Sequence, residues 1–237
     1  ETVTNPNDPR QYDTASKRIR ELMEKTPMPQ DIETAIRRAY AELNKRFALK
    51  DTFVAVRSSA TAEDLPDASF AGQQETYLNV KGSDELIEKV IKCWSSLFTP
   101  RAIFYRNEKG FPHEKVFISV GVQKMVNSRC AGVMFTINPV TGNRDEIVID
   151  GNFGLGETVV SVAVNPDDFV VDKQTMTVKE RRISKKTIKY IRDPKTGKTI
   201  HLDVPEEEQR TVCITDQEIT KLAELAKRIE KHYGKPM

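Results

Sequence analysis

The hydrophobic residues of this chain change their spacing after residue 50, and the change limits the folds open to it. Before residue 50, apolar side chains recur at Ile32, Ile36, Tyr40 and Leu43, a stripe typical of an amphipathic helix. Later, short apolar runs separated by turn residues indicate strands and hairpins, with helical stretches between them. Helices and strands mixed in this way favour an α+β fold.

Turn residues and caps divide the chain into expected elements. Because Pro6 and Pro9 stand among Asn and Asp, we expect the first dozen residues to form a loop. Ser83 is the expected cap of one helix, and Thr215 with Glu218 forms a capping box for the last. The first expected helix carries Ile19, Leu22 and Met23 and ends at Thr26-Pro27, and later helices follow Pro29, begin at Pro100, and follow the caps Ser83 and Thr215. The expected strands span 53–57, 76–80, 116–126, 129–137, 146–149, 169–172, 175–180, 189–192 and 199–203.

The charge and cysteine content exclude several classes of protein. The 237 residues include 37 basic and 35 acidic side chains without a block of like charge, which gives no support for nucleic-acid or membrane binding. Three widely spaced cysteines match no metal-ligand or disulfide pattern and indicate a reducing compartment. Because no apolar run is long enough to span a bilayer, we expect a cytoplasmic protein.

An arginine at a strand end is the first candidate for chemistry. Arg57 closes the apolar run 53–57 and is followed by small hydroxyl residues, so its guanidinium would be held rigidly enough to grip phosphate oxygens. The alternative is a surface ion pair, which is common. Gly72 would let a backbone approach a ligand and Thr76 would add a hydroxyl; a simple turn glycine is the other interpretation.

Two further segments resemble small-ligand sites only weakly. Gln123 and Met125 combine a polar and an apolar side chain on one strand, so an adenine ring could lie there; Met125 could equally fill the core. The loop 152–157 is rich in glycine and ends at Glu157, but its glycines do not match the dinucleotide fingerprint. It is either a phosphate loop or a sharp turn.

Taken together, these segments are more specific than any one of them. Residues 56–74 read VRSSATAEDLPDASFAGQQ, followed by MFTINPVTGN at 134–143 and GLGE at 154–157. This order resembles the phosphoenolpyruvate synthases of the pyruvate phosphate dikinase family over nearly the whole chain. The resemblance implies a partial ATP-grasp-like domain over 1–237, with mixed or antiparallel sheets and flanking helices. Within it we expect a helical lead-in (1–50), a phosphate-side subdomain (51–115), and a strand-rich adenine-side subdomain with the terminal helix (116–237).

The same resemblance implies a reaction and its residues. Enzymes of this family use Mg-ATP to phosphorylate a histidine on a separate swivelling domain, and a pyruvate-binding domain then forms phosphoenolpyruvate, with release of AMP and phosphate. Carried over by position, Arg57 would hold the ATP phosphates as the catalytic residue. The other implied nucleotide contacts run from phosphate and ribose to adenine: Gly72, Thr76, Gln123, Met125 and Val126. Glu157 would organise the neighbouring loop.

Several parts of the family pattern have no counterpart here. The glycine-lysine loop is expected before Glu1, the magnesium-binding Asp-Ile-Glu segment after Met237, and no stretch resembles the phosphohistidine motif. We therefore expect no metal ligands within the chain and no complete catalysis by it. Two alternatives stay open: the nucleotide domain of a phosphotransferase acting on a rifamycin or a phenol, and a non-catalytic nucleotide-binding module.

Overall fold

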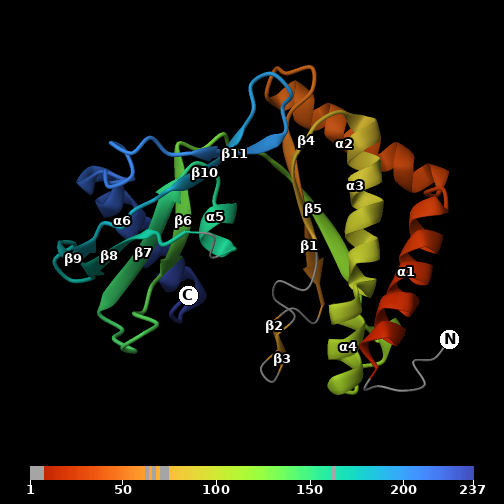
Figure 1. Cartoon of the computed structure of the whole chain (residues 1–237), viewed down its shortest axis with the longest axis horizontal. Coiled ribbons are helices and arrows are strands. Elements are labelled where there is room, and N and C mark those ends of the chain that lie inside the picture. The colour runs from red at the N-terminus through yellow and green to blue at the C-terminus, as the bar shows by residue number, and fades with distance from the viewer. Residues whose placement is uncertain (1–7, 62–63, 66–67, 70–74, 162–163) are drawn as a thin grey trace. The chain divides into compact units, whose positions relative to one another are not determined.

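The computed structural model describes residues 8–61, 64–65, 68–69, 75–161 and 164–237. It divides the chain into two compact units, Glu1–Met125 (unit 1) and Val126–Met237 (unit 2). The named strands pair antiparallel within each unit, and helices stand beside them, which confirms the α+β class (Figure 1).

Unit 1 combines helices with a three-stranded sheet. The sheet has the order β4-β1-β5, with β1 in the centre and both pairs antiparallel. Its elements are α1 (Pro9–Lys25), α2 (Gln30–Arg46), β1 (Val54–Ala60), β2 (Asp64–Leu65), β3 (Ala68–Ser69), β4 (Thr76–Val80), α3 (Ser83–Ser95), η1 (Ser96–Phe98), α4 (Pro100–Glu108), η2 (His113–Lys115) and β5 (Ile118–Lys124).

The sheet of unit 1 buries one face and leaves the other open. Val54 and Val56 are fully buried and pack with Leu86 and Val90 of α3, which lies along this face (Figure 1). Because side chains alternate along a strand, the residues between them project to the opposite face. That opposite face carries Arg57 of β1 and Gln123 of β5, both of which are exposed.

Two predicted boundaries in unit 1 are wrong. The first helix begins at Pro9 and not after a loop of a dozen residues, because Asp8 caps it and proline suits the first helical position. Ser83 does not cap α3. Gly82, at φ +88°, precedes the helix, and the Ser83 hydroxyl accepts a hydrogen bond from Arg37 at 2.8 Å.

Unit 2 packs the last helix against a four-stranded antiparallel sheet of order β6-β7-β8-β9. Ile219, Ala223 and Ala226 of the helix are fully buried against strand residues that include Ile147 and Phe169. The elements are β6 (Cys130–Phe135), β7 (Glu146–Phe153), α5 (Glu157–Val160), β8 (Asp167–Asp172), β9 (Val178–Arg182), β10 (Ile188–Arg192), β11 (Thr199–Asp203) and α6 (Asp216–Tyr233). β7 continues beyond the predicted end at Ile149.

Local signals and long-range contacts both shape unit 2. The capping box of Thr215 and Glu218 is present at the start of α6, as predicted, and Gly234 ends the helix in the left-handed conformation. The sequence alone does not predict the ion pair between Lys186 and Asp167, whose charged atoms lie 2.5 Å apart with both side chains fully buried. This pair ties the segment after β9 to the start of β8.

Among the helices of the described ranges, none is both long and apolar enough to cross a membrane.

Candidate functional site

Three of the predicted nucleotide contacts share the open face of the unit 1 sheet. Arg57 of β1 lies opposite Thr76 of β4 on one side and Gly121 of β5 on the other. Gln123 lies opposite Ala55, two residues before Arg57, and so belongs to the same face. The side chains of Arg57, Thr76 and Gln123 are all exposed there, and Arg57 Nη1 lies 3.5 Å from Gln123 Oε1.

The backbone of Arg57 is held in place by the neighbouring strands, and its guanidinium makes no ion pair within the described ranges. β1 is the central strand, so the backbone around Arg57 is hydrogen-bonded to strands on both sides. None of the ion pairs among the described residues involves Arg57. Arg57 thus has no carboxylate partner within the described part of the chain, and a guanidinium in this state, opposite Gly121, suits the bidentate binding of phosphate oxygens.

An irregular register decides which residue faces Arg57. Val54 pairs with Val80, but Val56 pairs with Tyr77, so β4 contains one extra residue in between. A regular ladder would place Tyr77 opposite Arg57; the irregularity places Thr76 there instead. Buried Asn79, at φ +57°, lies within this stretch. Bulges of this kind often occur beside functional sites because they redirect side chains.

The remaining predicted contacts lie elsewhere or outside the described residues. Gly72 falls in the segment 70–74, which the structure does not describe. Met125 follows β5, is half-buried, and donates its N–H to the carbonyl of Phe53 at 2.8 Å. Val126 is 71% exposed, and Glu157 begins α5 in unit 2 with an exposed side chain. Their contacts with a nucleotide stay predictions.

The glycine of the 154–157 segment has a packing role. Gly154 has φ +76°, and a Cβ there would lie 2.2 Å from the carbonyl oxygen of Tyr190 in β10. Both the conformation and the close approach require glycine. This accounts for Gly154 without a phosphate, although it does not test the role assigned to Glu157.

The 134–143 motif forms a tight turn. Asn138 is buried, and its side-chain oxygen accepts the N–H groups of Val140 and Thr141 at 3.0 and 3.2 Å. Its amide nitrogen donates to Glu146 at 2.8 Å, across the turn at the start of β7. The motif therefore holds the β6–β7 connection in one conformation.

Sequence reasoning missed two groups of polar residues. Ser59 and Ser119 pair across β1 and β5 and share the face of Arg57; the alternation along both strands was the signal that could have found them. Asp150 and Asp168 pair across β7 and β8. Burial, and then the charge of Asp168, raise the pKa of Asp150 to about 6. Only the strand register brings these two carboxyl groups together.

The chain resembles known proteins over its whole length. Residues 1–237 match the family model described as "Pyruvate phosphate dikinase, AMP/ATP-binding domain". The chain belongs to this family. Its fold is accordingly of the ATP-grasp type.

Curated relatives include the phosphoenolpyruvate synthase of Pyrococcus furiosus, 51% identical over 98% of this chain and 29% of the relative. The probable phosphoenolpyruvate synthase of Archaeoglobus fulgidus is 55% identical over 97% of this chain and 30% of the relative. That of Methanocaldococcus jannaschii is 50% identical over 98% of this chain and 19% of the relative. The chain thus spans a third or less of the length of these relatives.

The described residues contain no cluster of metal-binding side chains. Across the ranges that the structure describes, no three His, Cys, Asp or Glu side chains gather closely enough to hold a metal ion. We therefore assign no step to magnesium. The exposed guanidinium of Arg57 with the Thr76 hydroxyl and the Gln123 amide does fit a nucleotide, because these groups offer donors for phosphate and hydroxyl oxygens.

Proposed function

We propose that this chain is the ATP-binding module of a cytoplasmic phosphoenolpyruvate synthase. In this proposal Mg-ATP phosphorylates a histidine on a separate domain, and the phosphoryl group passes to pyruvate on a further domain. The overall balance is ATP, pyruvate and water to AMP, phosphoenolpyruvate and phosphate. The observation that carries the proposal is the shared face of Arg57, Thr76 and Gln123 in a chain of the AMP/ATP-binding family.

The chemistry demands positioning and charge neutralisation rather than a protein nucleophile in this module. Charge on the transferring phosphoryl group spreads over its oxygens, and fixed donors stabilise it most when they need not reorganise. Arg57 meets this need because the central strand holds its backbone. Thr76, directly opposite, would add a hydroxyl donor to the phosphate or ribose, and Gln123 would contact the nucleoside.

The proposal also includes nucleotide contacts that the described residues do not test. Gly72, a few residues before Thr76, would bring backbone close to the phosphates, and Met125 with Val126 would lie against adenine. Glu157 would order the loop beside the nucleotide. These assignments rest on the family resemblance and on the placement of Arg57, Thr76 and Gln123.

The test uses the complete open reading frame that contains this chain. AMP, phosphate and phosphoenolpyruvate are measured with pyruvate, and separate reactions offer a phenol or a rifamycin as acceptor. We expect the three products in equal amounts with pyruvate alone. Phosphorylation of the phenol or the rifamycin instead of pyruvate would contradict the proposed acceptor.

A variant tests the site itself. We expect Arg57→Ala to weaken ATP binding at least about tenfold, since a hydrogen-bonded charge typically contributes 1.5–3 kcal/mol. Arg46→Ala, at an exposed arginine ending α2, is the matched control and should leave the affinity unchanged. An ATP affinity and turnover unaffected by Arg57→Ala would favour a non-catalytic module.

A further inference from the structure

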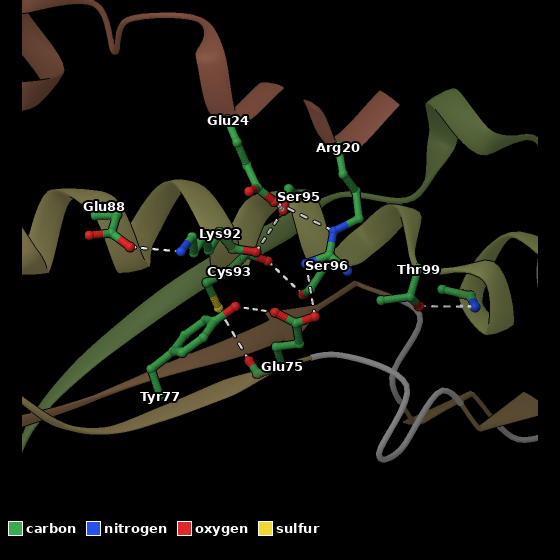
Figure 2. Close-up of polar contacts among 11 residues, drawn as sticks. Arg20, Glu24, Glu75, Tyr77, Glu88, Lys92, Cys93, Ser95, Ser96 and Thr99 are labelled. Carbon is green, nitrogen blue, oxygen red and sulfur yellow. Dashed lines mark hydrogen bonds and ion pairs between the residues drawn. The ribbon is translucent and has the colours of Figure 1, made fainter. Parts of the chain in front are cut away.

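A polar network fixes the residue immediately before Thr76. Glu75 receives Arg20 of α1, whose Nη2 lies 2.9 Å from Oε1 of the carboxylate. The Tyr77 hydroxyl donates to the other oxygen, Oε2. The thiol of Cys93 in α3 lies 3.5 Å from the Glu75 carbonyl (Figure 2). Both carboxylate oxygens and the backbone of Glu75 are thus engaged by three elements.

The arginine of this network is itself held in place. Arg20 Nε lies 3.5 Å from Glu24 on the next turn of α1, and the Ser95 hydroxyl donates to the same Glu24 oxygen at 2.7 Å (Figure 2). The side chains of Arg20 and Glu75 are only 25% and 34% exposed, so solvent screens their attraction less than that of a surface pair. Burial, and then Glu75, raise the pKa of Tyr77, so its hydroxyl keeps the proton that it donates.

We propose that Arg20 and Glu75 are positioning residues for nucleotide binding, which hold the start of β4 so that Thr76 faces Arg57. This inference rests on the proposed function. Since side chains alternate along a strand, anchoring Glu75 and Tyr77 on the helix side directs Thr76 to the open side. The extra residue in β4 interrupts the ladder, and a slip by one residue would turn Thr76 toward the helices. Glu75 immediately precedes β4, so its contacts with Arg20 and Tyr77 would prevent this slip.

A double-mutant cycle separates positioning from general stabilisation. The ATP affinity of the complete protein encoded by the open reading frame that contains this chain is measured for Arg20→Ala, Thr76→Val and the double variant. We expect Arg20→Ala to weaken ATP binding roughly tenfold in the parent chain and to have almost no further effect beside Thr76→Val. Arg20→Lys, which keeps the charge, should restore part of the loss.

One further variant serves as a control, and another repeats the test at the partner residue. Arg37→Ala removes an arginine that bridges Glu33 and Asp84 in the same unit, and it should leave ATP affinity unchanged. Glu75→Gln removes the carboxylate charge while keeping the side-chain shape, and it should reproduce the effect of Arg20→Ala. It also takes the place of Arg20→Ala should that variant fail to fold.

The outcomes distinguish the two proposals. Equal losses from Arg20→Ala with and without the Thr76 hydroxyl would overturn the positioning role, as would a similar loss from Arg37→Ala. Should Arg57→Ala weaken binding while Arg20→Ala and Glu75→Gln do not, only the positioning inference fails. Should the complete parent protein bind no ATP, or Arg57→Ala have no effect on its affinity, the proposed function fails and this inference falls with it.

Discussion

Replacing Lys186 by methionine should break the buried ion pair of unit 2. The Lys186 ammonium donates to Asp167 Oδ1 at 2.5 Å and to the Ser184 carbonyl at 3.0 Å, and both charged side chains are fully buried. Asp167 also accepts the N–H groups of Ser184 at 3.0 Å and Cys213 at 2.9 Å. After Lys186→Met, the carboxylate would keep the N–H groups of Ser184 and Cys213 but lose the ammonium that neutralises its charge.

The size of the effect follows from this loss. Removing one partner of a buried pair costs about 3–5 kcal/mol, because the other charge stays buried without compensation. A domain's total stability is about 5–15 kcal/mol, so the loss is a large part of it. With a urea slope of about 1–3 kcal/mol/M, the unfolding midpoint should fall by roughly 1–5 M.

The assay follows urea unfolding by far-UV circular dichroism, and the fluorescence of Trp94, the single tryptophan, reports separately on α3 of unit 1. Lys185→Met is the matched control, since Lys185 is exposed, and it should change stability by less than about 0.5 kcal/mol. Asp167→Asn in the Lys186→Met background should recover part of the loss. A Lys186→Met variant within about 1 kcal/mol of the parent would refute the reasoning.

Three further outcomes are expected. Because the folded pKa of Asp150 is raised to about 6, the folded chain takes up this proton at higher pH than the unfolded chain; stability from this group is therefore gained as pH falls from 7 toward 4. Relative to Asp150→Asn, the parent should gain on the order of 1 kcal/mol in urea unfolding over that range, after discounting for solvent screening. Gly132→Ala places a Cβ 1.8 Å from the Asp150 carbonyl oxygen and should cost about 1–3 kcal/mol, whereas Gly121→Ala meets only a 3.8 Å contact and should be nearly neutral. The chain by itself should not convert ATP to AMP in a single-turnover assay, and AMP formation without other domains would contradict that expectation.

Much of the secondary structure follows from signals that are local in sequence. Thr99 before Pro100 predicts the start of α4, and the structure shows its side chain accepting from Ala102. The capping box at Thr215 likewise predicts α6. Where a local signal was misread, as at Pro9, the same kind of signal explains the result: Asp8 caps and proline begins the helix.

The candidate site was predictable as a set of residues but not as an arrangement. The family resemblance identifies Arg57, within the 56–74 stretch, and Thr76, two residues after it, and hydrophobic alternation predicts that a strand carries each. That they lie opposite each other depends on the strand order β4-β1-β5 and on one extra residue in β4. The alternation pattern gives the faces of one strand and leaves its partner and register open.

Sequence by itself determined most of the elements, several of their caps, the α+β class and the family resemblance of this chain, because periodicity and capping act between residues a few positions apart. Only the tertiary structure decided which residues meet across the strands: Thr76 beside Arg57, Asp150 beside Asp168, and Arg20 on Glu75. It also decided that Lys186 is fully buried, although lysine is usually exposed. Each of these contacts joins residues that are distant in the chain or lie on different elements, and packing selects them through burial and register.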